Sequence, residues 1–597
     1  MRLRWSAMTE PPSLPAAGSL IPSRPAGADA TVIRLGPSAA ARCRRRIHLD
    51  TANADQRIPV TRSVRRAIDE LTEHRDRVLR AFRDAHGLAG SADPNDDPSA
   101  ADAGRPPADR WREHPQPMVL MPNLATGARS GSPDILLWAG DGYQPVIIRA
   151  HRTRDAGAGA RVAPLARPLS ARLDPKHRAR RHRADRLALA HHYRQLVDLG
   201  CASATARGGV IGRGSPTDGA GRRESFDGED DATVIVWHHL DSAGSSTLND
   251  YDRRFSDRVA IAGAAVAGGP ALAFPSRVAE CRRCQWWPRC STELRRTGDI
   301  SLLLTGDDVQ TARDAGVGTI ADVAGLAPTD LAALVRALSQ GANLQVRARA
   351  WLRGTPLVRS GQRTALRRAD VEVDVDAESY VDDGAYLWGA LLSGADVGVP
   401  AGYRSFVTWE HLPSPEQGAI FGAFFQHLVQ IRDAAADRGL SCAVFCYGKA
   451  AEERWMLGLA RRYAGLPGVP DAREVAAFCA SPQWSDLMAE ISRQFVLPGS
   501  LRLKELAGAV GFAWRDPEPG GENSMAWYRE AIGIEPGVAA RPPAVEDPGN
   551  PMAQRVLRYN EDDVLATLAV RRWITEHLSE LPTVAELEAD TPAAGAP

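Results

Sequence analysis

Four cysteines have the residue types and spacing of a metal or cluster site. Three of them form a C-x2-C-x5-C arrangement at Cys281, Cys284 and Cys290, in a chain of 597 residues with 8 cysteines. Zinc and iron–sulfur clusters select thiolate ligands, and a tetrahedral set needs a fourth. Cys43 is predicted to supply it, with Cys201 in reserve. The spacing leaves zinc and an iron–sulfur cluster both open.

Carboxylates in the C-terminal half form a second group. Asp376 and Glu378 lie two residues apart on a predicted strand, residues 371–378, so both side chains leave the same face. Adjacent carboxylates repel unless a cation lies between them, and oxygen ligands favour Mg²⁺ or Mn²⁺. Asp374 shares this face and competes for the role, and a solvated edge strand is the alternative.

Two later stretches add acids that an α/β sheet would bring to the same place. Glu452 follows a predicted strand, residues 443–447, and so lies at a carboxyl edge, where α/β sites usually form. Asp563 follows Tyr559 by four residues in a predicted helix, on one helical face.

The elements that must position these residues predict several domains, because 597 residues exceed one core. Residues 31–298 are expected to form a first domain, residues 365–580 an α/β domain, and residues 1–30 and 582–597 disordered ends. Between the domains, residues 299–345 resemble a helix-hairpin-helix, a segment whose turn amides can meet a phosphate.

The charge balance gives no overall positive field that would attract nucleic acid. The formal net charge is +0, so a nucleic-acid partner must be held by local patches. The predicted patch is a run of arginines, with a solvated face as the alternative: Arg178, Arg180, Arg181 and Arg183. No apolar run is long enough to span a bilayer, and the absence of a secretory signal predicts a cytoplasmic protein.

The order D-x-E, an acid after a strand, and Y-x3-D resembles the DEDD exonucleases of the RNase H-like superfamily. The resemblance implies 3'–5' phosphodiester hydrolysis with two Mg²⁺ or Mn²⁺ ions bound by four acids, and a tyrosine, Tyr559, that orients water. The implied acids are Asp376, Glu378, Glu452 and Asp563. Glu452 departs from the usual aspartate. The stretch 501–506 resembles the "S-L-K-E-L" element of that family.

The cysteines bracket a predicted hairpin, residues 133–138 and 143–149, in a way that looks like RecB-type PD-(D/E)xK nucleases with an iron–sulfur staple. Most of the chain resembles an actinobacterial branch of RecB-like nucleases with a C-terminal RNase H-like domain of the YprB type. The resemblance implies a [4Fe–4S] cluster, with zinc as the alternative.

The hairpin departs from that family. Asp134 matches, but Ile147 and Arg149 stand where the family has an acid and a lysine. Isoleucine cannot bind a metal, and arginine is a poor proton-handling group. The first domain is therefore predicted to be a degenerate nuclease that binds nucleic acid.

The leading prediction is a metal-dependent nuclease, with DNA favoured over RNA and a role in repair or recombination. Two alternatives remain. One is a non-catalytic nucleic-acid-binding scaffold, and the other an iron–sulfur accessory subunit whose helicase partner is encoded elsewhere.

Overall fold

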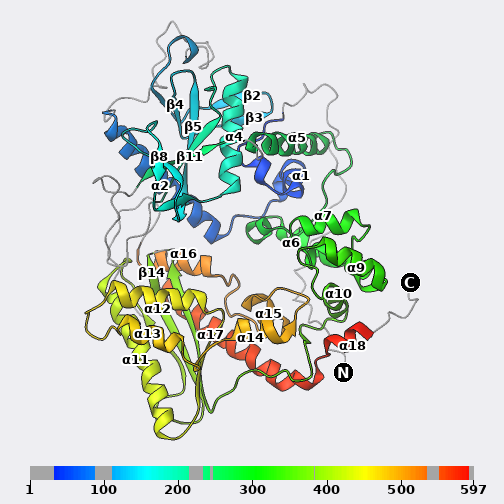
Figure 1. Ribbon diagram of the computed structural model, residues 1–597, viewed down its shortest axis with the longest axis vertical. Coiled ribbons are helices and arrows are strands. Elements are labelled where there is room, and N and C mark those ends of the chain that lie inside the picture. The colour runs from blue at the N-terminus through cyan, green and yellow to red at the C-terminus, as the bar shows by residue number, and fades with distance from the viewer. Residues whose placement is uncertain are drawn as a thin grey trace. The chain divides into compact units, whose positions relative to one another are not determined.

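The computed structural model describes residues 33–87, 111–213, 233–242, 246–381, 383–533 and 550–589. The chain divides into two compact units at Cys290 and Ser291, and each has its own sheet and core (Figure 1). The predicted disordered segment 1–30 lies outside the described residues.

The first unit is built around a seven-stranded mixed sheet. In spatial order the strands are β1 (Met118–Leu120), β4 (Ile135–Trp138), β5 (Tyr143–Arg152), β10 (Arg207–Arg213), β11 (Val234–His239), β7 (Ala160–Pro164) and β8 (Arg172–Asp174). Strands β5 and β10 are parallel, and the other neighbours are antiparallel. The predicted hairpin is confirmed as β4 and β5, closed by a hydrogen bond from the Ala139 amide to the Gly142 carbonyl.

Two helices cover opposite faces of this sheet. Helix α2 (Arg62–Ala85) packs Phe82 into the cluster that holds Ile148, whereas α4 (Arg183–Asp198) packs against the cluster that holds Ile147. Neighbouring residues of a strand point to opposite faces. Strand β5 is therefore buried on both sides, which explains its continuous run of hydrophobic residues.

The start of the second unit is helical. Helices α7 (Asp307–Asp314) and α8 (Ile320–Gly325) flank the turn predicted to meet a phosphate. In that turn the amides of Gly318 and Thr319 donate to Asp322 Oδ2 over 3.0 and 2.8 Å. Because a carboxylate of the chain occupies these amides, they are not free for a phosphate.

The rest of the second unit is organised by a five-stranded sheet. Its spatial order is β15 (Gly402–Val407), β14 (Gly384–Gly394), β13 (Val371–Tyr380), β16 (Cys442–Cys446) and β17 (Trp484–Asp486). The central strand β13 is antiparallel to β14 and parallel to β16. The strands predicted over 371–378 and 443–447 are thus confirmed.

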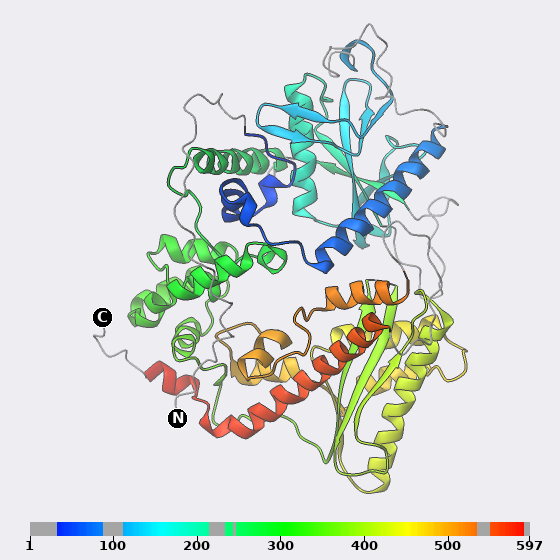
Figure 2. The ribbon, with the colours of Figure 1, turned by 180° about the vertical axis from the view of Figure 1, so that it is seen from behind.

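Helices cover both faces of this sheet. Helices α11 (Pro415–Asp437) and α12 (Ala450–Arg462) share a hydrophobic core with the valines of β13. Helix α17 (Pro551–His577), red in Figure 2, crosses the other face. The valines at alternate positions fix the strand against its core, and the acids between them face α17.

The C-terminal segment differs from the prediction of disorder from residue 582. Residues Val584–Ala589 form helix α18, whose Leu587 is fully buried against Val346 and Ala350 of α10 (Leu344–Leu352). Leu587 therefore anchors this helix by hydrophobic packing, although the composition of the segment is acidic. Residues 590–597 lie outside the described part. None of the described helices is both long and apolar enough to cross a membrane.

Candidate active site

Three of the predicted acids converge between β13 and α17. One carboxylate oxygen each from Asp376, Glu378 and Asp563 lies within 4.8 Å of the others. Glu378 and Asp563 are buried, and Asp376 is half-buried. The strand contributes two acids from one face, and the facing helix contributes the third.

A lysine and a tryptophan hold Asp563 in place. Lys504 Nζ lies 3.2 and 3.3 Å from the two Asp563 oxygens and donates to the Tyr559 hydroxyl over 2.7 Å. Trp514 Nε1 donates to Asp563 Oδ1 over 2.6 Å. The helical spacing of Tyr559 and Asp563 thus brings both side chains to the same lysine.

A separate chain of hydrogen bonds orients Asp376. Asn560 Nδ2 donates to Asp376 Oδ2 over 2.8 Å, and its Oδ1 accepts from the Tyr403 hydroxyl over 2.7 Å. The side chain of Asn560 has room beside Asp376 because the residue opposite Asp376 in β14 is Gly389. A Cβ on Gly389 would lie 2.0 Å from Asn560 Oδ1, so any larger residue must displace the amide.

When all three are ionised, the acids carry more negative charge than their described surroundings neutralise. Among the described residues, the one ion pair to this group comes from Lys504. Burial, followed by the neighbouring Asp563 charge, raises the pKa of Glu378 to about 8. Burial, followed by the charges of Asp563, Glu378 and Glu452, raises the pKa of Asp376. Crowded carboxylates with raised pKa values hold protons until a cation replaces them, which fits a divalent-metal site.

The fourth predicted acid, Glu452, lies beside this group rather than within it. It stands in the first turn of α12 and is buried, and its Oε2 has no hydrogen-bond partner among the described residues. Burial raises the pKa of Glu452 to about 7. Its charge acts on Asp376, so the two side chains share one electrostatic environment.

The competing acid, Asp374, has a structural partner. Arg571 of α17 donates to Asp374 Oδ2 over 2.8 Å and also bonds Glu372, and all three side chains are buried. Burial raises the pKa of Asp374 to about 6 despite Arg571, so the carboxylate is ionised at neutral pH. This half of the strand face is neutralised by the chain itself.

Sequence reasoning missed the residues that orient the acids, namely Lys504, Trp514 and Asn560. The sequence does mark Lys504, because it is one of three lysines in the chain and stands in the stretch 501–506 that resembles a family element. No local signal marks Asn560, which reaches Asp376 across 184 residues of sequence.

The cysteines of the first unit gather in one pocket. Cys43 precedes α1 (Arg44–Ala52), and the other three lie in and after the short helix Ala279–Arg283 and in α6 (Trp287–Thr297). All four line a pocket with Arg46 and Glu280. Arg46 and the Cys43 amide both bond Glu280, over 2.6 and 2.7 Å, which joins the two ends of the unit.

Two thiols of this pocket hold their protons more tightly than a free cysteine does. Burial, together with charges of the neighbouring thiols, raises the pKa of Cys281 and of Cys290 to about 11. Among the described residues no three cysteine sulfurs lie within 4.8 Å of one another. The reserve ligand Cys201 lines no part of this pocket and packs beside Tyr143.

The hairpin residues of the first unit are held by partners of opposite charge or by the core. Asp134 accepts from the Ile148 amide over 2.6 Å and pairs with Arg75. Ile147 is buried against α4. Arg149 Nε donates to Asp185 Oδ1 over 3.0 Å. The described hairpin therefore presents no group of unpaired acids.

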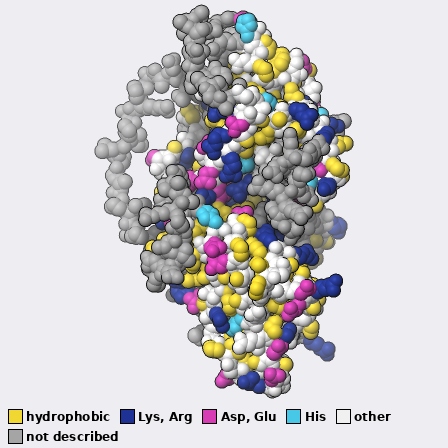
Figure 3. All heavy atoms as spheres, turned by 90° about the vertical axis from the view of Figure 1, so that its left-hand side faces the viewer, with side chains coloured by type: hydrophobic (Ala, Val, Ile, Leu, Met, Phe, Trp, Pro, Cys, Tyr) yellow, Lys and Arg dark blue, Asp and Glu magenta, His cyan; other side chains and the backbone are white. Residues whose placement is uncertain are grey.

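The predicted arginine patch is exposed, but two of its four members already have acidic partners. Arg180 lies 3.3 Å from Asp155, and Arg183 lies 2.7 Å from Asp250. Arg178 and Arg181 are also exposed. On the face of the molecule in Figure 3, basic and acidic side chains are interspersed.

A comparison with protein families supports the nature of the second unit. Residues 471–575 match the model of an RNase H superfamily family, RNase_H_2. This stretch contains Lys504, Trp514 and Asp563 and begins after the strand that carries Asp376 and Glu378. No curated protein and no solved structure matches the chain. The C-terminal part of the chain thus contains an RNase H-like domain, which points to nuclease chemistry on nucleic acid.

Proposed function

We propose that this protein is a divalent-metal-dependent nuclease whose active site consists of Asp376, Glu378 and Asp563, with Glu452 beside them. The observation that carries the proposal is the group of three converging carboxylates with one lysine as ion-pair partner. The RNase H superfamily match over residues 471–575 supports the same chemistry. A structural cluster of this kind would require cations from the chain, as Arg571 supplies for Asp374.

The three acids are the residues that would hold Mg²⁺ or Mn²⁺, and the bound ions would activate water and stabilise charge on the phosphate. Burial raises the pKa of Tyr559 well above its ordinary value, so its phenol keeps its proton at neutral pH. A protonated phenol beside the acids can donate to water or to a phosphate oxygen. Lys504 supplies positive charge at the same place, and Asn560 fixes the orientation of Asp376.

The substrate and direction follow from the family resemblance. We propose 3'–5' cleavage of DNA in preference to RNA, in repair or recombination. The first unit would bind nucleic acid through Arg178, Arg180, Arg181 and Arg183 and would hold a [4Fe–4S] cluster on Cys43, Cys281, Cys284 and Cys290. The shared pocket of the four thiols supports a bound group there, and the family resemblance favours the cluster over zinc.

The test of the activity uses the full chain on end-labelled single-stranded and duplex DNA and RNA, with Mg²⁺, Mn²⁺ or EDTA. We expect metal-dependent cleavage that Asp563→Asn lowers by about 10³-fold or more, as for loss of a group that stabilises the transition state. Glu561→Gln on the same helix is the matched control, because it pairs with Arg515 at the surface. Binding without cleavage in any metal would instead favour the scaffold or the accessory subunit.

The test of the cluster is separate from the activity. Protein purified without oxygen should be brown, contain iron, and lose folding stability in Cys284→Ser, because metal-binding free energy is folding free energy. Stoichiometric zinc with background iron would reject the cluster and leave the nuclease proposal intact.

A further inference from the structure

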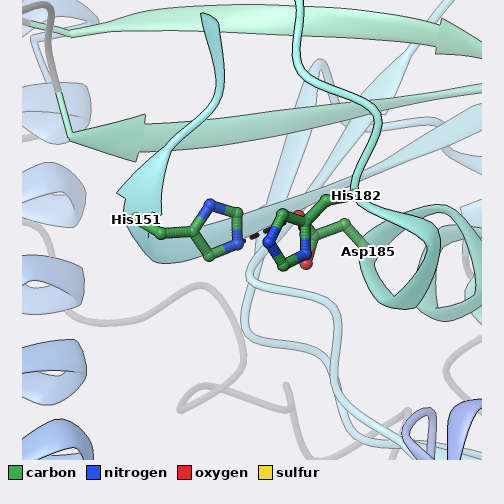
Figure 4. A group of neighbouring side chains, drawn as sticks. All are labelled: His151, His182 and Asp185. Atoms are coloured by element: carbon green, nitrogen blue, oxygen red, sulfur yellow. Dashed lines mark ion pairs between the residues drawn. The ribbon is translucent and has the colours of Figure 1, made fainter. Parts of the chain in front are cut away.

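A second group of potential metal ligands lies in the first unit, away from the cysteines. One ligand atom each from His151, His182 and Asp185 lies within 4.8 Å of the others (Figure 4). His151 stands near the end of β5, His182 directly before α4, and Asp185 in the first turn of α4. The strand and the helix start thus bring two imidazoles and one carboxylate together.

The contacts of His151 place either a proton or a metal ion at its second nitrogen. His151 Nδ1 lies 3.0 Å from the Arg152 carbonyl, which only accepts, so Nδ1 carries a proton. His151 Nε2 lies 3.1 Å from Asp185 Oδ2, which as a carboxylate also only accepts. Either a second proton or a metal ion must lie between these two atoms. A backbone carbonyl on the remote nitrogen is the arrangement that metal-binding histidines usually have.

The partners of Asp185 leave one oxygen for the ion. Arg149 Nε bonds Oδ1, while Oδ2 faces both His151 Nε2 and His182 Nδ1, at 3.1 and 3.8 Å. Ligand atoms bound to one zinc ion at ~2.0–2.1 Å lie at about these separations from one another. Arg149, placed where the nuclease family has a lysine, therefore orients a ligand in this structure.

The site is open on one side. The Asp185 side chain is 7% exposed, whereas that of His182 is 49% exposed. An ion held by three side chains would keep positions for water or another ligand on the His182 side.

We propose that His151, His182 and Asp185 bind a divalent transition-metal ion, with Zn²⁺ the best match to two imidazoles and a carboxylate. The site goes beyond the proposed nuclease centre and shares no residue with it. The adjoining pocket is lined by Arg181, Arg183 and Arg186 and by Asp250, which pairs with Arg183, so it keeps a surplus of positive charge. The open positions of the ion should therefore take an anionic ligand such as a phosphate oxygen.

The experiment is a zinc titration of the full chain by calorimetry, in wild type and in His182→Asn. His182 is the ligand to replace, because its half-exposed side chain can change without loss of fold, which circular dichroism verifies. We expect the wild type to bind one zinc ion per chain more than the variant, or to bind that ion at least about tenfold more tightly. His239→Gln, an exposed histidine at the end of β11, should behave as wild type.

The comparison between variants separates this site from zinc bound by cysteines, which both proteins share. Asp185→Asn should remove the same ion, because the amide has lost the charge. Equal zinc stoichiometry and affinity in wild type and His182→Asn would overturn the proposal and identify the group as a protonated His151–Asp185 ion pair.

Discussion

Two halves of one strand face differ in what the facing helix places against them. Glu372 and Asp374 meet Arg571 of α17, whereas Asp376 and Glu378 meet Asp563 of the same helix. The strand pattern is the same in both halves, an acid at every second residue. The residues of α17 make one half a buried salt bridge and the other half a group of acids. The group of acids requires a cation from outside the chain.

The largest effect should come from breaking the neutralised half. Arg571→Met leaves the buried Asp374 without a cation, whereas Glu372 keeps its pair with Arg368. The loss should lower the free energy of unfolding by about 3–5 kcal/mol. Urea denaturation of the C-terminal unit measures this change. Arg432→Met, which breaks an exposed pair with Asp433, should cost at most about 1 kcal/mol. Equal small losses in both variants would contradict the structural role of Arg571.

The next effect should come from disturbing the orientation of Asp376. Gly389→Ala pushes its new methyl against Asn560 Oδ1, so Asp376 loses a fixed hydrogen bond. We expect the Mn²⁺ concentration needed for half-maximal activity to rise by about 10- to 100-fold, as for loss of a residue that orients a ligand. Gly458→Ala in α12, where a Cβ meets nothing within 4 Å, is the matched control. An unchanged metal requirement would show that Asn560 does not position the site.

A smaller effect should appear in the metal-free protein as pH changes. The pKa of Glu378 is about 8 in the folded state, against 4.5 ordinarily. Between these values the native state binds more protons than the unfolded state, so stability falls as pH rises from about 5 to 8. Glu378→Gln should flatten this fall and stabilise the protein at pH 8 by about 1–2 kcal/mol.

Thermal unfolding in EDTA across this pH range measures the effect, with Glu561→Gln as the control. Added Mg²⁺ should reverse the loss in wild type and leave Glu378→Gln less affected. A wild-type stability that instead rises from pH 5 to 8, with the rise abolished in Glu378→Gln, would contradict the raised pKa of Glu378.

The smallest effect is expected in the first unit. Asp134→Ala should leave nuclease activity nearly unchanged, because Ile147 is a core residue and Arg149 is engaged by Asp185. The labelled-substrate assay measures it. Loss of most activity would mean that the first unit cleaves nucleic acid after all.

The sequence was sufficient for the strands and for the shared face of their acids, because alternation in a strand is a local property. It was also sufficient to predict that Asp376, Glu378 and Asp563 belong together. It could not separate Asp376 from Asp374, because that choice depends on Arg571 and Asp563, which stand far along the chain. The prediction of a phosphate-binding turn before α8 was wrong for a similar reason. The side chain of Asp322 accepts hydrogen bonds from the amides of that turn.

The most direct test of this difference is diffraction from crystals soaked in Mn²⁺, with data collected at a wavelength where manganese scatters anomalously. We predict anomalous density between Asp376, Glu378 and Asp563, and none beside Glu372 and Asp374. Absence of density at the first group under saturating Mn²⁺, or density at the second, would contradict the account.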